Sequence, residues 1–176
     1  MNDTSSTSRV AVITGASSGI GAATARALAT GGYQVALLAR RADRIEALAA
    51  ELGGGSIAIQ ADVTDRDSLL TAAQRVQDEL GGADVLVNNA GTMLLGPFSS
   101  AQHADYRAMV EANLLGAITA TEVFLDQLKD GGGDLINISS VAGRTARATN
   151  GVYAATKWGV NGWSESLRQE LLPDIR

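Results

Sequence analysis

The sequence contains no cysteine and only one histidine in 176 residues. Without cysteine the chain has no disulfide bonds and no thiolate metal ligands, which fits a reducing compartment. His103 lies in a polar stretch and belongs to no cluster of metal-binding side chains. We therefore predict no metal site.

Long apolar runs are also lacking, and this absence bears on membrane association. No run approaches the ~20 residues that a helix needs to span a bilayer. Residues 1–8 are polar and lack the charged and apolar regions of a signal peptide. We therefore expect a cytoplasmic protein with no membrane partner and with disordered residues 1–8.

Basic residues are not in excess: 14 Lys and Arg stand against 19 Asp and Glu, and the net charge is −5. This balance argues against nucleic acid as a partner, because an acidic chain and the phosphate backbone repel one another. Hydrophobic residues make up 45% of the sequence, as in ordinary globular proteins. We expect one domain over residues 9–176.

Strand and helix patterns alternate along the whole sequence. We predict strands at residues 10–13, 34–39, 56–61, 85–87 and 135–139, and helices at 20–30, 43–52, 67–80, 104–129 and 152–172. This alternation favours a parallel sheet with helices on both faces, a doubly wound, three-layer α/β/α fold. Ligands bind such sheets at the carboxyl ends of the strands, where this chain has its glycine-rich turn and most of its unusual polar side chains.

The segment 14–21 is a glycine-rich turn between the first strand and the first helix. Gly15, Gly19 and Gly21 let the backbone turn tightly and approach a ligand closely. The first turn of the helix then presents free N–H groups, which suit a pyrophosphate, and Ser17 and Ser18 could add hydroxyl donors. A turn without a ligand is the alternative, because the spacing differs from the common Gly-x-Gly-x-x-Gly pattern.

Arg40 and Arg41 follow the second strand, where dinucleotide-binding folds contact the adenosine ribose. An acidic residue there binds a 2′-hydroxyl, whereas an arginine accommodates a 2′-phosphate through its planar donor fork. No carboxylate stands at this point, so the sequence favours NADP over NAD. The alternative is that the two arginines simply begin a solvated helix.

Tyr153 and Lys157 are four residues apart in the last predicted helix and therefore share one helix face. A neighbouring ammonium favours the phenolate and moves the tyrosine pKa from about 10 toward neutrality, where acid/base catalysis works best. Ser140 could donate a hydrogen bond to a substrate oxygen. Asn113 is a poor helix former inside the long helix, which suggests a kink or a bound water. Taken singly, each of these residues could be purely structural.

Together, in this order, the motifs resemble those of the short-chain dehydrogenase/reductase family from Arg9 to the end of the chain. They are Thr14-Gly15-x-x-x-Gly19-x-Gly21, Asp62-Val63, Asn88-Asn89-Ala90-Gly91, Asn113, Ser140 and Tyr153-x-x-x-Lys157. The family places its serine thirteen residues before its tyrosine, which selects Ser140 rather than Ser139. The resemblance implies a Rossmann-type fold and hydride transfer between a nicotinamide cofactor and a carbonyl or secondary alcohol.

The resemblance also implies residue roles. Tyr153 would be the general acid/base, and Lys157 would assist it and hold the nicotinamide ribose. Ser140 would polarise the carbonyl, and Asn113 would hold a water in a proton relay. Asp62 and Val63 would meet the adenine. The expected cofactor-binding residues are Gly15, Ser17, Ser18, Gly19, Ile20, Gly21, Arg40, Arg41, Asp62, Val63, Asn89, Ala90, Gly91, Tyr153 and Lys157.

Three further expectations rest on short segments. Residues 91–97 are similar to the clavulanic-acid-dehydrogenase-like branch of the family and would form an apolar wall beside the carbonyl site. Arg144 and Arg147 could meet an anionic substrate group, with simple solvation as the alternative. Complete family members continue with further strands and a substrate lid, so the resemblance implies a C-terminally incomplete fold whose fifth strand is an exposed edge.

The family's subunit contacts lie on the last two long helices, which here carry Trp158, Trp163, Val110, Leu114 and Phe124. We predict a homodimer or homotetramer with one or both tryptophans at the interface, core packing being the alternative. The predicted function is NADP-dependent interconversion of a carbonyl and a secondary alcohol on a small, mostly apolar substrate. The alternatives are a 3-oxoacyl-thioester reductase acting on an acyl carrier protein and a cofactor-binding chain without turnover.

Overall fold

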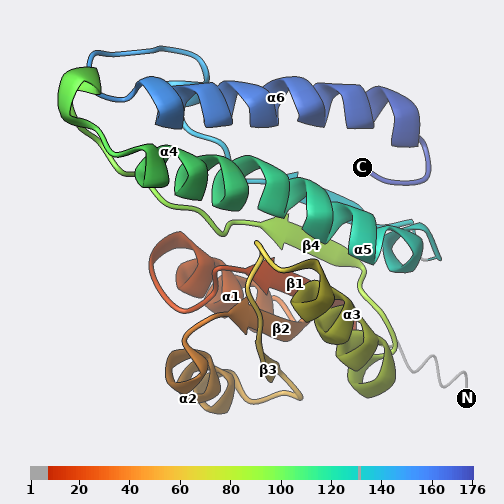
Figure 1. Ribbon diagram of the computed structural model, residues 1–176. Helices are drawn as coiled ribbons and strands as arrows, with labels where there is room; N and C mark the ends of the chain where they lie inside the picture. Colours follow the sequence, from red (N-terminus) through yellow and green to blue (C-terminus); the bar gives the residue numbers. More distant parts are fainter. Residues whose placement is uncertain (1–7, 131) are drawn as a thin grey trace, which may run out of the picture.

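The computed structural model describes residues 8–130 and 132–176 (Figure 1). Its five strands form one parallel sheet in the order β3-β2-β1-β4-β5. Their bounds are β1 Val10–Thr14, β2 Gln34–Ala39, β3 Ile57–Gln60, β4 Val85–Asn88 and β5 Asp134–Asn137. The predicted parallel sheet is confirmed. Of the residues expected to be disordered, 1–7 lie outside the described part of the chain.

Helices cover both faces of the sheet (Figure 1). Ala11 and Ile13 of β1 are buried in a core with α1 (Gly19–Thr30) and α2 (Ala42–Leu52). Val10 and Val12 belong to a second core with α3 (Arg66–Leu80), α5 (Gly116–Asp130) and the end of α6 (Gly151–Leu171). The side chains of a strand alternate between its two faces, and both faces of β1 are apolar and buried. The three-layer Rossmann-type architecture is therefore confirmed, and every predicted element ends within two residues of its observed bounds.

The long predicted helix is present but not uniform. It consists of α4 (His103–Val110), a π-helical turn η2 (Glu111–Leu115) and α5. Asn113 lies in the widened turn, so the irregularity predicted there is present. By length and composition alone the whole helix, His103–Asp130, could cross a membrane, with a mean hydropathy of 1.3 over its most apolar window. The core helix of a globular domain meets the same test, and α5 buries Ala120, Phe124 and Leu128 under the sheet.

The expected subunit-contact residues differ in exposure. Phe124 is fully buried in the core on the face of α5 that packs on the sheet, so it is not available for a subunit contact. Trp158 is 53% exposed, so the alternative that it packs in the core is wrong. Trp163 and Leu114 are half-buried, and Val110 is 36% exposed.

Within the described residues β5 is an edge strand, because it pairs only with β4. Ile136 is 44% exposed on this strand. The backbone of Arg176 continues the parallel pairing: its N–H donates to Gly133 O at 3.0 Å, and Leu135 N donates to Arg176 O at 2.8 Å. The side chain of Arg176 also forms an ion pair with Asp134 at 3.1 Å. The last residue of the sequence is thus fixed to the sheet.

Candidate active site

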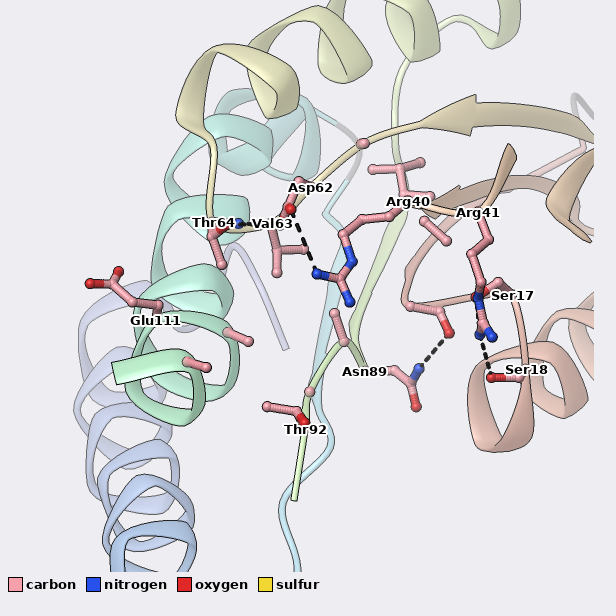
Figure 2. A pocket seen from close by; sticks show the side chains of 18 of the residues that line it. Ser17, Ser18, Arg40, Arg41, Asp62, Val63, Thr64, Asn89, Thr92 and Glu111 are labelled. Atoms are coloured by element: carbon pink, nitrogen blue, oxygen red, sulfur yellow. Dashed lines mark hydrogen bonds and ion pairs between the residues drawn. The ribbon is translucent and has the colours of Figure 1, made fainter. Parts of the chain in front are cut away.

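A cleft of about 1090 Å³ opens at the carboxyl ends of the central strands (Figure 2). It brings together most of the residues that the sequence assigned to a cofactor, from four separate segments. These are Gly15, Ser17, Ser18, Ile20, Arg40, Arg41, Asp62, Val63, Asn89, Ala90 and Gly91. Gly19 and Gly21 adjoin this wall without lining the cleft, and neither Tyr153 nor Lys157 lines it. The cleft also includes polar residues that the sequence analysis missed, namely Thr64, Thr92 and Glu111.

The glycine-rich turn is packed directly against the end of β4. A Cβ atom on Gly15 would lie 2.7 Å from Ala90 Cα, and one on Gly21 would lie 2.5 Å from the carbonyl oxygen of Gly15. Asn89 Nδ2 donates to Thr14 O at 3.0 Å and to Gly15 O at 3.2 Å. The buried hydroxyl oxygen of Thr14 accepts from Asn89 N and Ala90 N in return. Only glycine permits this close approach, so the two loops form one fixed surface.

The two arginines at the rim of the cleft have different partners (Figure 2). Arg41 Nη2 donates to Ser17 Oγ at 2.7 Å and to Ser18 Oγ at 2.9 Å. Arg40 Nη1 lies 3.9 Å from Asp62 Oδ2, and its side chain is 80% exposed. Among the described residues Arg41 thus contacts hydroxyls rather than a carboxylate, and its positive charge is not neutralised. Such a cluster of donors at the N-terminus of a helix suits an anion.

Lys157 is nearly buried, and its amine is aimed at the end of β5. Lys157 Nζ donates to Ile138 O at 2.8 Å. Burial lowers the pKa of this amine, because the low-dielectric surroundings disfavour its charged form. Tyr153 lies one helical turn earlier and is half-buried. The main-chain carbonyl of Ile138 therefore fixes Lys157 beside the helix face that carries Tyr153.

Both serines after β5 take part in local hydrogen bonds. Ser140 Oγ accepts from Ala142 N at 3.1 Å and caps a short 3₁₀ turn. This arrangement uses an acceptor position of the hydroxyl, and no described group receives its hydrogen. Ser139 Oγ instead donates to Lys157 O at 3.4 Å. Ser140 is therefore the serine that keeps a free donor, in line with the spacing argument.

Asn113 is buried, and three hydrogen bonds hold its amide. Asn113 Oδ1 accepts from Thr92 N at 2.7 Å, and Nδ2 donates to Thr92 O at 2.8 Å and to Thr156 Oγ1 at 3.2 Å. Both amide hydrogens are therefore used inside the protein. A water at this side chain would have to donate to Oδ1. The relay role of Asn113 stays a prediction.

Arg144 and Arg147 do not form one site. Both are exposed, but Arg144 lines a hollow beneath α6 with Asn161 and Glu165, whereas Arg147 lines a separate hollow between the loops that precede α4 and α6. Each can be solvated where it lies. No group of three or more His, Asp or Glu side chains in the described residues could hold a metal ion.

Some missed residues carried a usable signal. Thr64 stands two residues after Asp62, the spacing of an Asx turn, and its N–H and hydroxyl both donate to Asp62 Oδ1, at 3.0 and 2.8 Å. Thr92 directly follows the Asn88-Asn89-Ala90-Gly91 motif. Thr156 carried no local signal, because its partner Asn113 lies far away in the sequence.

The glycine-rich turn, the asparagine pair and the Tyr153–Lys157 helix face thus stand together at one end of the sheet. The model of the family described as short chain dehydrogenase matches residues 9–176. The chain belongs to this short-chain dehydrogenase family. The match covers every predicted site residue, although it does not test their individual roles or the clavulanic-acid-dehydrogenase-like branch, which stay predictions.

Relatives in the short-chain dehydrogenase family include the ketoacyl reductase HetN of Nostoc sp., which is 37% identical over 96% of this chain. The chain spans 60% of the length of HetN. Among solved structures, the alcohol dehydrogenase of the archaeon Thermococcus sibiricus, complexed with 5-hydroxy-NADP, superposes with a TM-score of 0.91 at 37% identity. The match covers 96% of this chain and 73% of that one. A metagenomic short-chain oxidoreductase in complex with NADP superposes with a TM-score of 0.90 at 37% identity. That match covers 98% of this chain and 81% of the oxidoreductase.

Proposed function

We propose that this chain binds NADP(H) and interconverts a carbonyl and a secondary alcohol on a small, mostly apolar substrate. The observation that carries the cofactor assignment is the Arg41 guanidinium, which two serine hydroxyls hold at the rim of the cleft without a neutralising carboxylate among the described residues. An NAD-specific site would be expected to present a carboxylate there.

The cleft fits a dinucleotide. Its volume of about 1090 Å³ lies just above the usual range of ligand pockets, about 300–1,000 Å³. Gly15 lines the cleft, and Gly15 and Gly21 let the turn pack closely against Asn89 and Ala90. Arg41, Ser17 and Ser18 would hold the 2′-phosphate, and Asp62 the adenine. When bound, the dinucleotide donates or accepts a hydride at its nicotinamide ring.

The catalytic groups follow from their hydrogen-bonding capacity. Ser140 keeps a free O–H donor that can polarise the substrate carbonyl. Tyr153 gives its phenolic proton to the substrate oxygen in reduction and removes it from the alcohol in oxidation. Lys157, anchored by Ile138 O, lies on the same helix face and stabilises the phenolate that forms.

Exposed apolar side chains around Ser140 and the end of β4 support the apolar nature of the substrate. Met93 is 57% exposed, Leu95 53% and Val141 74%. Such side chains lose contact with water when an apolar ligand covers them, which contributes about 25 cal/mol per Å². Small ketones and secondary alcohols with an apolar body are therefore the substrate class that this surface fits.

A fluorescence titration with NADPH and with NADH tests the cofactor assignment. We expect saturable binding that favours NADPH by at least tenfold, about 1.4 kcal/mol. Arg41→Gln should lower this preference by weakening NADPH alone, whereas Arg168→Gln, which removes an exposed guanidinium at the far end of α6, should change neither affinity. Equal binding of the two nucleotides by the wild-type chain would refute the role of Arg41.

Turnover is tested with a panel of aliphatic and aromatic ketones and NADPH. Tyr153→Phe should abolish reduction while NADPH still binds, because only the proton donor is removed. Loss of NADPH binding in this variant would contradict the assigned role. NADPH binding without reduction of any ketone would favour the alternative of a cofactor-binding chain without turnover.

A 3-oxoacyl-thioester reductase is the second candidate, favoured by the likeness to a ketoacyl reductase and by Arg147 beside the segment that precedes Tyr153. Including 3-oxoacyl thioesters of an acyl carrier protein in the panel distinguishes it. Arg147→Gln should then raise KM for the carrier-bound substrate only.

We also propose a homo-oligomer through α4, α5 and α6, which lie side by side in Figure 1. Trp158 is 53% exposed on this surface and Leu115 43%. Light scattering of the wild-type chain should give a dimer or tetramer, and Trp158→Arg should shift it toward the monomer. A wild-type monomer would refute this proposal.

A further inference from the structure

Thr156 stands between Tyr153 and Lys157 in α6 and is only 2% exposed. Its hydroxyl donates to Tyr153 O at 2.7 Å and accepts from Asn113 Nδ2 at 3.2 Å. One buried hydroxyl thus joins the turn that carries the proposed acid/base to the widened turn η2. Neither cofactor nor substrate needs to touch Thr156 for this contact to matter.

The contact extends beyond Asn113. The amide of Asn113 accepts a hydrogen bond from Thr92 N at 2.7 Å and donates one to Thr92 O at 2.8 Å. Thr92 directly follows the cleft-lining residues Asn89 to Gly91. A continuous hydrogen-bonded chain therefore runs from Thr92 through Asn113 and Thr156 to Tyr153. It connects the residues that line the cleft after β4 to the turn of α6 that carries Tyr153.

Space around this chain is tight. A Cβ atom on Gly91 would lie 2.9 Å from Asn113 Oδ1, so only glycine at position 91 leaves room for the amide where it lies. On the other side, Lys157 is anchored separately by Ile138 O at 2.8 Å. Tyr153 and Lys157 are thus fixed by different elements, and the Thr156 hydroxyl is the link that relates Tyr153 to the cleft.

We propose that Thr156 is a positioning residue that sets the place of Tyr153 relative to the cofactor cleft. The proposal rests on the proposed function only in assigning acid/base chemistry to Tyr153. Thr156→Val keeps the shape of the side chain but removes the hydroxyl. The Asn113 amide then loses one buried partner, and the Tyr153 carbonyl loses its bond from position 156.

Thr121 provides a matched control. It is 3% exposed in α5, and its hydroxyl donates to Ala117 O at 2.9 Å and accepts from Asn88 Nδ2 at 2.8 Å. Thr121→Val therefore removes the same kind of buried asparagine–threonine contact, one with no direct bond to Tyr153. Any general effect of losing a buried hydroxyl appears in both variants.

The first readout needs neither substrate nor cofactor. The chain has three tyrosines, so ¹³Cζ-tyrosine labelling gives three resonances, and Tyr153→Phe identifies that of Tyr153. We expect Thr156→Val to move this resonance, Thr156→Ser to restore it, and Thr121→Val to leave it in place. An unmoved Tyr153 resonance in Thr156→Val would overturn the proposal. If Thr156→Val does not fold, Thr156→Ala serves the same comparison.

The second readout is kinetic and uses the ketone that the wild-type chain reduces fastest. We expect Thr156→Val to lower kcat about tenfold or more, since small misplacements of catalytic groups have large effects. KM and the NADPH dissociation constant should remain close to wild type, and Thr156→Ser should recover kcat. Equal losses in Thr156→Val and Thr121→Val would overturn the proposal. A wild-type chain without turnover would count against the proposed function alone, and the NMR comparison would still decide the role of Thr156.

Discussion

A methyl group at position 21 has no room in this structure. The Cβ of Gly21→Ala would lie 2.5 Å from both Gly15 O and Asn89 Nδ2. Overpacking of this kind costs about 1–3 kcal/mol. If Asn89 moves aside, it loses its bonds to Thr14 O and Gly15 O, each contributing about 0.5–1.5 kcal/mol. Alanine regains about 1 kcal/mol of helix propensity. We expect a net loss of about 3 kcal/mol in the free energy of unfolding.

Urea and thermal unfolding measure this loss, and the melting temperature should fall by about 2–4 °C for each kcal/mol in a chain of this length. NADPH affinity should fall as well, because Gly15 and Asn89 line the cleft. Gly162→Ala is the control: Gly162 is a glycine of α6 with nothing within 4 Å of its Cβ position. It should stabilise the chain by about 0.5–1 kcal/mol. If Gly21→Ala is as stable as wild type, the packing of the turn against Asn89 is wrong.

The two phenylalanines of the sequence allow a matched comparison by urea unfolding. Phe124 is fully buried, and Phe124→Ala should lower the unfolding free energy by about 3–5 kcal/mol. Phe98 is 85% exposed, and Phe98→Ala should lower it by less than about 0.5 kcal/mol. Asp65→Ala removes the carboxylate that caps two N–H groups of α3 and should lower the unfolding free energy by about 1 kcal/mol. Burial lowers the pKa of Lys157, so between that value and 10.5 the unfolded chain binds more protons and stability rises with pH. This rise of the unfolding free energy with pH should be present in Lys129→Met and absent in Lys157→Met, as measured by urea unfolding at a series of pH values.

The order of the elements was predictable because each has its own local period. Strand β2 is apolar and buried from Val35 to Ala39, as a strand covered on both faces must be, and glycines such as Gly81, at φ +88°, mark helix ends. Exposure within a long apolar helix was not predictable to the same degree. Phe124 and Trp158 are both large aromatic residues on helices, yet the first is buried and the second exposed. Only the packing of each helix decides which face it buries.

The residues of the candidate site also fall into those that the sequence could predict and those that it could not. Gly15, Tyr153 and Lys157 could be picked out because their chemistry depends on spacing along one segment. Thr156 could not, because its proposed role depends on a hydrogen bond from Asn113, on another helix, at 3.2 Å. A threonine in a helix has no special meaning until its partner is known. Hydrogen bonds between distant segments are therefore the part of the site that required the structure.

Arg40 and Arg41 show how sheet register decides which side chain reaches the serines of the glycine-rich turn. Parallel pairing sets Thr14 opposite Leu38. Ser17 lies three residues after Thr14 and Arg41 three residues after Leu38, so these two side chains face one another. A shift of one residue would bring Arg40 to the serines instead. Register is fixed by sequence where a strand has one apolar and one polar face, but β1 and β2 are apolar on both. Their pattern is compatible with either register, which is why the sequence could propose an arginine for the 2′-phosphate but could not say which of the two faces the serines.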